Sequence, residues 1–242
     1  MNRHCLFLFG LFALAPVRAQ DAPPQRITIT GSATPQAPSV AGFGDIPLSR
    51  APFSATVIDQ RQLRDAGISS LGDITRLDAA FTDAYNAPGY WNQVAVRGYT
   101  LDNRSNYRRD GLPINAETVI GQANKQSLEV LKGTSGLQAG TSSPGGLLNL
   151  VVKRPHDRIR DASLAWAQDS TLEAAVDVGD RSDAFGWRVN ASAARLDPQL
   201  RASRGNRSLL GAAFDARLGG ATFVEAEIEL SRQSQPSTPG FS

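Results

Sequence analysis

The stretch that decides the fold runs from Leu128 to Pro155 and reads LEVLKGTSGLQAGTSSPGGLLNLVVKRP. Two apolar segments typical of β-strands, Val130-Leu131 and 147–152, flank a crossing rich in Gly, Ser and Thr. The glycines of this crossing allow close backbone approach and positive φ angles, which bulkier residues would prevent. We therefore expect a segment that can be packed inside another part of the protein.

The residues before this stretch predict short helices and strands. Ser54 to Ile58 is typical of a strand, and it leads into a helix that Asp59 caps and Gly67 ends. A second helix is expected after Ser70. The apolar face of this helix would carry Leu71, Ile74 and Leu77. One more strand is predicted over 94–98, and Asp110-Gly111 predicts a tight turn between 106–109 and 112–114. Residues 45–155 are therefore predicted to form one compact α+β domain.

Beyond Pro155 apolar and polar residues alternate with a period of two, in segments of roughly ten residues. In 223–230, for example, Glu225, Glu227 and Glu229 alternate with apolar residues. A soluble sandwich alternates as well, but its strands average about 5 to 6 residues, whereas tilted strands that cross a bilayer have about 9 to 11. Segment length favours antiparallel strands of a transmembrane β-barrel over 156–242. Roughly five strands are predicted and a closed barrel needs at least about eight, so we expect a fragment or a truncated product.

The N-terminus predicts a secretory signal peptide over residues 1–19. Arg3 supplies a positive charge, 5–14 is apolar, and 17–19 is a cleavage site with small residues. Pro16 and Arg18 end the apolar run short of the ~18 residues that a membrane helix needs. We therefore expect Sec-type export. Cys5, the only cysteine, would leave with the peptide, so no disulfide is expected.

Residues 20–44 are predicted to be a flexible arm, because they offer too little apolar surface to offset the cost of ordering. The exception is the alternating segment 26–31, with Ile27 and Ile29. An extended β-branched segment of this kind can pair with the sheet edge of a partner. An incidental β-prone patch in a tail explains the same residues.

Several function classes find no support in the composition. Without the signal peptide, 23 basic residues balance 23 acidic ones, which does not suggest a nucleic-acid partner. The glycines of 133–146 lack the Gly-Lys-Ser/Thr of a P-loop. Only His156 remains after cleavage, and no serine lies in a Gly-x-Ser-x-Gly elbow. We predict no enzyme, no catalytic residue and no metal site of protein side chains.

Four groups of residues resemble a known family, the TonB-dependent outer-membrane receptors, and within it the siderophore receptors. They follow one another in the family's order over about a hundred residues. The groups are Val96-Arg97-Gly98-Tyr99; Asn106-Tyr107 with Asp110-Gly111-Leu112-Pro113; 128–133; and Ser143-Pro144-Gly145-Gly146 through 149–155. The chain departs from the family at Gly133-Thr134, where Gly-Pro is usual, and at Gln126-Ser127, where an acidic residue and an arginine are common. These departures put the substrate class in doubt rather than the fold.

The resemblance implies a plug domain over about 49–154, followed by the start of a barrel of about 22 strands whose lumen the plug fills. The segment 21–31 lies where such receptors carry the TonB box. The TonB-interacting residues would be Ile27, Thr28, Ile29 and Thr30. The extra periplasmic signalling domain of some relatives is expected to be absent.

The function implied is the import of ferric siderophores by a monomeric barrel in outer-membrane lipid. A filled barrel admits a bulky ligand only if the plug moves, and the energy would come from TonB with its inner-membrane motor complex. Arg97 and Lys132 match positions whose cations pair with barrel carboxylates in similar receptors, and we call them the predicted latch. A solvated surface charge is the alternative for each, since exposed pairs contribute only ~0.2 to 1 kcal/mol.

Ligand contact is expected from three plug loops, 85–92, 101–104 and 115–118. The predicted ligand-binding residues are aromatic side chains and hydrogen-bonding groups suited to an iron-bound hydroxamate or catecholate: Tyr90, Trp91, Asn103, Arg104 and Tyr107. The aromatic residues could instead pack against the barrel wall. No cofactor is expected, because iron would travel inside the ligand. Other cargo (cobalamin, heme or an oligosaccharide) and a truncated binding module that does not transport remain alternatives.

Overall fold

A computed structural model of the chain describes residues 53–133, 144–166, 171–220 and 222–237. The predicted signal peptide, the arm with its TonB-box-like segment and the crossing 134–143 lie outside the described residues. All tests of the fold below therefore concern the remaining part of the chain.

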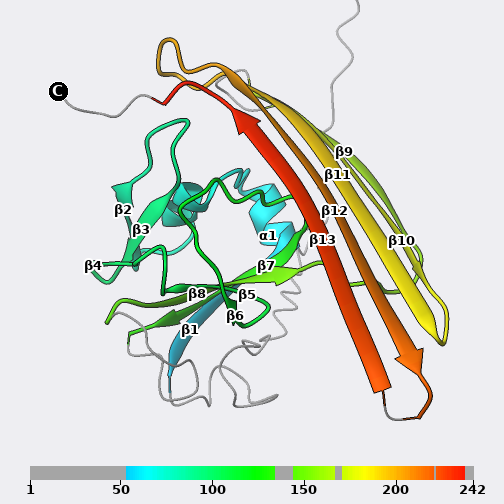
Figure 1. Cartoon of the computed structure of the whole chain (residues 1–242). Coiled ribbons are helices and arrows are strands. Elements are labelled where there is room, and N and C mark those ends of the chain that lie inside the picture. The colour runs from blue at the N-terminus through cyan, green and yellow to red at the C-terminus, as the bar shows by residue number, and fades with distance from the viewer. Residues whose placement is uncertain (1–52, 134–143, 167–170, 221, 238–242) are drawn as a thin grey trace, which may run out of the picture. The chain divides into compact units, whose positions relative to one another are not determined.

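A mixed five-stranded sheet forms the centre of the N-terminal part, with the order β1-β7-β8-β5-β6 (Figure 1). Its strands are β1 (Ser54–Asp59), β7 (Lys125–Lys132), β8 (Gly146–Val152), β5 (Tyr107–Arg109) and β6 (Leu112–Pro113). Neighbours pair antiparallel except β5 and β8, which are parallel. The two apolar segments of the stretch 128–155 are thus adjacent central strands. β7 and β8 have most of their residues buried, as expected of a segment enclosed on both faces.

Two short helices follow β1, namely α1 (Gln60–Asp65) and the 3₁₀-helix η3 (Leu71–Arg76). The predicted capping box of α1 is present. Asp59 Oδ1 accepts a hydrogen bond from the Gln62 backbone N–H at 2.8 Å, and the Gln62 side chain accepts one from the Asp59 backbone N–H. The second helix begins after Ser70, as predicted, and it is a 3₁₀-helix. Its apolar residues repeat every three positions, which is the period of a 3₁₀-helix. Among the described residues, no helix is long and apolar enough to cross a membrane.

A small sheet, β2 (Phe81–Tyr85), β3 (Gln93–Val96) and β4 (Tyr99–Thr100), completes this part. β3 and the turn at Gly98 agree with the strand predicted over 94–98. Its buried residues join the helices and the mixed sheet in one hydrophobic core: Ile58, Leu63, Leu71, Ile74, Phe81, Val94, Val96, Leu101, Tyr107, Leu128, Val130, Leu148 and Leu150 among others. The α+β architecture predicted for this part is therefore confirmed.

Five long antiparallel strands follow in sequence order. They are β9 (Ile159–Trp166), β10 (Leu172–Arg181), β11 (Phe185–Leu196), β12 (Gly205–Leu218) and β13 (Thr222–Ser234). This confirms the strand number and the antiparallel order. β9 and β13 are the two edges of an open sheet, so the barrel is not closed in this chain.

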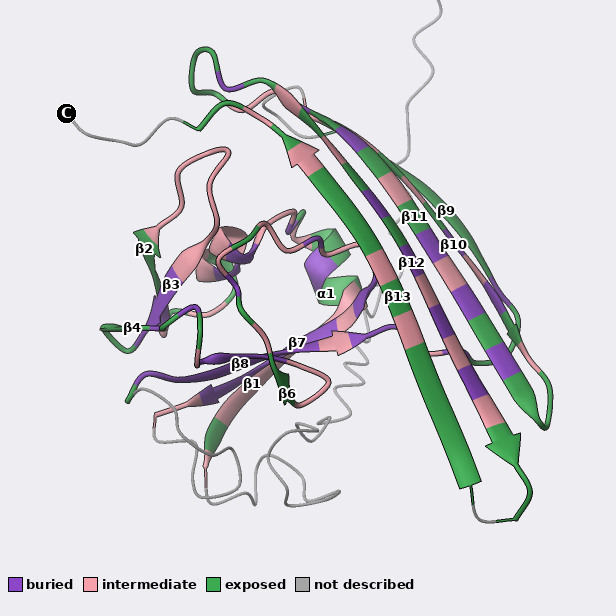
Figure 2. Ribbon diagram, viewed as in Figure 1, coloured by how far each residue is buried: buried purple, intermediate pink, exposed green. Residues whose placement is uncertain are grey.

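The two faces of this sheet differ as the period-two pattern predicts. Buried and exposed residues alternate along β11 (Figure 2): Arg188 and Asn190 are buried, while Trp187 and Ala191 on either side of them are exposed. The exposed face carries large apolar side chains from every strand, including Leu164, Trp166, Leu172, Val176, Phe185, Leu210, Ile228 and Leu230. One face is thus apolar and exposed, and the other carries the buried residues of β10, β11 and β12, among them Asp177, Arg188, Asn190 and Asp215.

Candidate functional site

Three loops of the N-terminal part surround an open cleft of about 430 Å³. These are the loops from which ligand contact was predicted, with the addition of the first residue of β3. The cleft is lined by Tyr85, Tyr90, Trp91, Gln93, Asp102, Asn103, Arg104 and Glu117. Its volume falls within the range of about 300 to 1,000 Å³ that is usual for small-molecule sites. Four of the five predicted ligand-binding residues are therefore brought together.

Three aromatic rings in mutual contact line part of the cleft. The ring centroids of Tyr90 and Trp91 lie 3.8 Å apart, and Tyr85 meets Tyr90 edge-on at 5.3 Å. The loop that carries them is tied by a hydrogen bond of 2.7 Å from Asn92 Nδ2 to Asn86 Oδ1. The half-buried rings thus form a rigid apolar surface of the kind that contacts flat or bulky ligands.

Asn103 holds two of the loops together. Its Nδ2 donates to the carbonyl of Asn92 at 3.0 Å and to that of Ala116 at 2.8 Å. Its side chain is almost completely buried. Both donor hydrogens of the amide are therefore used, and the orientation of the side chain is fixed.

Charged groups also line the cleft. Arg104 Nε donates to Glu117 Oε1 at 2.9 Å, and this bond and charge raise the pKa of Arg104. Asp102 Oδ1 accepts the backbone N–H groups of Arg104 at 2.8 Å and Ser105 at 3.1 Å. These hydrogen bonds, that from Arg104 first, hold the pKa of Asp102 below its usual range. The Asp102 carboxylate is therefore ionised at neutral pH.

Tyr107, the fifth predicted ligand-binding residue, does not line the cleft. It lies on β5 with no exposed surface, packed in the hydrophobic core. Burial raises the pKa of its phenol to about 12. The prediction that Tyr107 contacts the ligand is thus corrected, because the residue is a core side chain.

The predicted latch residues have different surroundings. Lys132 pairs with Asp78 of the same domain at 2.5 Å, and both side chains are nearly buried. A barrel partner for Lys132 is therefore not seen in the described strands and stays a prediction. Arg97 is exposed, has a positive φ of 53°, and forms no ion pair with any described residue. Its role likewise stays a prediction.

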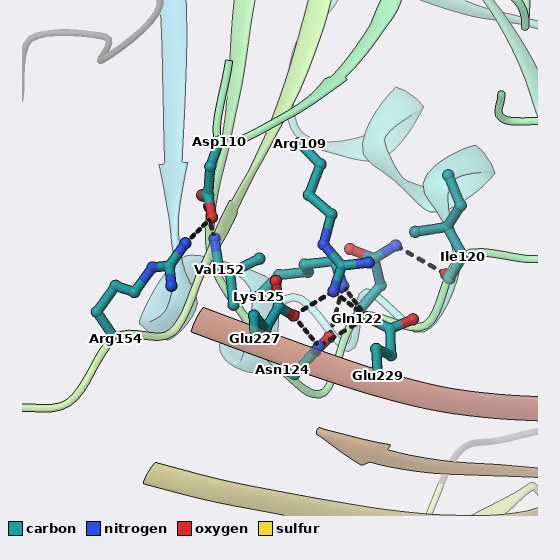
Figure 3. Close-up of polar contacts among 10 residues, drawn as sticks. All are labelled: Arg109, Asp110, Ile120, Gln122, Asn124, Lys125, Val152, Arg154, Glu227 and Glu229. Carbon is teal, nitrogen blue, oxygen red and sulfur yellow. Dashed lines mark hydrogen bonds and ion pairs between the residues drawn. The ribbon is translucent and has the colours of Figure 1, made fainter. Parts of the chain in front are cut away.

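A partly buried group of polar and charged side chains joins the mixed sheet to the polar face of β13 (Figure 3). We call it the β13 cluster; its members are Arg109, Asn124, Lys125, Glu227 and Glu229. Glu229 Oε2 accepts from Arg109 at 2.6 Å, from Asn124 at 2.7 Å and from Lys125 at 2.8 Å. Glu227 accepts from Arg109 as well. The two cations balance the two carboxylates, and Lys125 is 1% exposed.

A second buried ion network lies where the chain leaves β8. Lys153 Nζ and Arg188 both contact Asp177 Oδ2, at 3.0 and 2.7 Å. Arg188 also donates to the backbone carbonyl of Arg154 at 3.0 Å. Two separate networks therefore fix the mixed sheet to the polar face of the strands.

Neither network was predicted from the sequence. The signal that was present is the run of glutamates at 225, 227 and 229 on one face of a predicted strand, which indicated a polar face but no partners. Among the described residues, no group of three or more His, Cys, Asp or Glu side chains could hold a metal ion.

Comparison with known proteins gives the family of the first domain. A model of the TonB-dependent Receptor Plug Domain matches residues 47–147. The ferripyoverdine receptor of Pseudomonas aeruginosa is 30% identical over 135 residues, which are 52% of this chain and 16% of that receptor. The ferrichrome outer membrane transporter/phage receptor of Escherichia coli is 24% identical over 220 residues, 80% of this chain and 29% of that protein. The chain thus spans less than a third of the length of these relatives.

Solved structures share the fold. The closed form of the ferric-catecholate import receptor Fiu from Escherichia coli has a TM-score of 0.71 at 23% identity, over 83% of this chain and 29% of that one. The ferripyoverdine receptor of the outer membrane of Pseudomonas aeruginosa, bound to ferripyoverdine, has a TM-score of 0.67 at 20% identity, over 81% and 27%. The relatives are named as receptors and transporters, which confirms the prediction that the chain is not an enzyme. Residues 47–147 thus match the plug domain of the TonB-dependent receptors, and the chain shares the fold of solved siderophore receptors.

Proposed function

We propose that the protein containing this chain is a TonB-dependent receptor that imports ferric siderophores across the bacterial outer membrane. The observation that carries this proposal is the attachment of a plug domain to the polar face of a sheet whose other face is apolar and exposed. A strand sheet with one lipid-compatible face and one polar face is the wall of a membrane barrel. The plug then occupies the lumen and must move for any bulky ligand to pass.

The energy for this movement comes from TonB and its inner-membrane motor complex in our proposal. The segment Ile27 to Thr30 is the handle, because its alternating β-branched residues suit the addition of a strand to a partner sheet. Export by the signal peptide over 1–19 brings the chain to the periplasm, and the finished barrel is monomeric in outer-membrane lipid.

The cleft beneath the three plug loops is the plug's share of the ligand site. Its aromatic surface from Tyr90 and Trp91 supplies contact area, and Asn103 and Arg104 fix the loops around it. Iron enters and leaves inside the siderophore, so the protein needs no metal ligands of its own. The names of the ferripyoverdine and ferrichrome relatives support this class of cargo.

Deletion of the complete gene tests the proposal under iron limitation with defined siderophores as the iron source. We expect growth and uptake of radioactive iron to fail on at least one ferric siderophore and to return with the complete gene. Unimpaired uptake of every ferric siderophore tested would contradict the assignment.

A variant of the arm separates energy coupling from binding. Ile27→Pro removes a backbone donor and is expected to abolish uptake while ligand binding to outer membranes remains. Ala33→Pro, outside the segment 26–31, is the matched control and should transport normally. Loss of binding in Ile27→Pro would show that the arm is part of the fold rather than a handle.

A further inference from the structure

The cleft contains a buried hydrogen-bond acceptor that has no partner. Asn103 is 5% exposed and lines the cleft, and both hydrogens of its amide are donated to backbone carbonyls. Among the described residues, its Oδ1 receives no hydrogen bond. A buried acceptor left unpaired costs free energy, so a ligand that donates a hydrogen bond there is favoured.

The charges of the cleft are unbalanced. Arg104 is the one cation among its lining residues, and its guanidinium is already bonded to Glu117. Asp102 adds a second carboxylate to the lining, and the backbone N–H groups of Arg104 and Ser105 hold it in its ionised form. The lining therefore carries a net charge of one negative unit, and its only cation is engaged.

The aromatic rings favour the same sign of ligand charge as the charged residues do. The faces of Tyr and Trp rings are electron-rich and attract cations rather than anions. Trp91 and Gln93 can still donate hydrogen bonds to any ligand, so neutral contacts do not distinguish one siderophore class from another. The charge of the ligand does.

We propose that this cleft selects ferric complexes of zero or positive net charge that present hydrogen-bond donors, and disfavours trianionic complexes. This inference rests on the proposed function. Three hydroxamates lose one proton each and neutralise ferric iron, whereas three catecholates lose two each and leave three negative charges on the complex. The chemical class favoured is thus a ferric trihydroxamate on an amide- or amine-bearing backbone.

Equilibrium binding to the complete receptor in outer membranes tests the preference. The probes are a neutral ferric trihydroxamate built on a cyclic peptide and a ferric tris-catecholate. We expect the neutral complex to bind more tightly, with the difference shrinking as salt is added because like-charge repulsion is screened. Tighter binding of the tris-catecholate would overturn the inference while leaving the proposed function intact. Binding of no ferric siderophore would overturn the proposed function itself.

Removal of one charge tests the cause of the preference. Glu117→Gln keeps a hydrogen-bond acceptor for Arg104 but frees its positive charge. The affinity for the tris-catecholate should rise about tenfold, with little change for the neutral complex. Asp183→Asn, an exposed carboxylate in the β10–β11 turn, is the matched control and should change neither affinity. Equal effects of Glu117→Gln on both complexes would overturn the role of charge.

Discussion

Single residues show how local sequence can mislead about exposure. Tyr107 stands next to a predicted turn and close to a ligand loop, yet its side chain is in the core. The strand that carries it has three residues, and an alternating pattern that short does not reveal which face is buried. Asn103 and Arg104 precede it in a loop, where side chains need no alternation to reach the cleft.

This difference predicts opposite results for two aromatic substitutions. Trp91→Ala removes a ring that packs against Tyr90 at the cleft, so ligand affinity should fall about tenfold, or about 1.4 kcal/mol. Tyr107→Phe removes a buried hydroxyl away from the cleft and should leave affinity unchanged. Both affinities are measured by titrating outer membranes that contain the complete receptor with a ferric siderophore that the wild type binds. A large affinity loss in Tyr107→Phe would restore it as a ligand-binding residue.

The pair of Asp78 and Lys132 should make plug stability depend on acid. Burial raises the pKa of Asp78, but hydrogen bonds from Lys132, Thr56 and the Ala80 N–H outweigh it and hold the pKa below its ordinary value of 3.8. A carboxyl group with a depressed pKa gives stability above its unfolded pKa and loses it as the pH falls through the folded pKa. Asp78→Asn should therefore cost about 2 kcal/mol at neutral pH and remove part of the acid-dependent loss.

Unfolding free energies of the purified complete receptor in detergent, from neutral pH down to about pH 3, measure this effect. Asp65→Asn, an exposed carboxylate at the end of α1, is the control and should follow the wild-type curve. If Asp78→Asn and the wild type lost stability in parallel as the pH fell, the pair would not be the source.

Helices and strands could be predicted from the sequence where their signal is local and does not depend on distant partners. Alternation and glycine turns predicted β3, β7, β8 and all five long strands, and Asp59 with Gln62 predicted the start of α1. The helix after Ser70 was predicted without its type, because three apolar residues at a spacing of three fit a face of either an α-helix or a 3₁₀-helix. The mixed order of the central sheet, with β5 parallel to β8, was not predictable from spacing along the chain.

The start of β8 predicts a steric requirement at Gly146. This glycine has φ of +125°, and a Cβ there would overlap the carbonyl oxygen of Leu131 on β7. Gly146→Ala should destabilise the plug by about 3 kcal/mol, combining backbone strain with overpacking. Gly111→Ala is the matched control, because Gly111 has φ of +82° with open space around its Cβ position.

Gly111→Ala should cost only the left-handed backbone strain, about 1 kcal/mol. Urea unfolding of the complete receptor, monitored through the protease sensitivity of the plug, measures the loss of stability in both variants. Equal losses in the two variants would show that contact with Leu131 does not limit the packing of β8.

Across the whole molecule, the contacts of the β13 cluster join the plug to the strands through residues more than a hundred positions apart. Arg109 and Glu227, for example, are separated by 118 residues. Sequence pattern predicted that β13 has a polar face and that the plug is enclosed, but pattern carries no information on which side chains meet. The positions carried over from the resemblance, Arg97 and Lys132, did not include the charges that bind the described strands.

The β13 cluster should behave as one unit. Glu229→Gln leaves Lys125 buried without its charge partner, and Lys125→Met leaves Glu229 with one cation fewer to balance its charge. Each variant should therefore lose about 3 to 5 kcal/mol of stability. The double variant removes both charges together and should cost less than the sum, by about 2 kcal/mol or more.

Hydrogen exchange of the plug segment 120–132 in the complete receptor measures the three variants. Arg204 and Asp197 form an exposed pair whose removal is the control, expected to cost ~0.2 to 1 kcal/mol. If the two single losses simply added, Lys125 and Glu229 would act independently and the cluster would not behave as one unit.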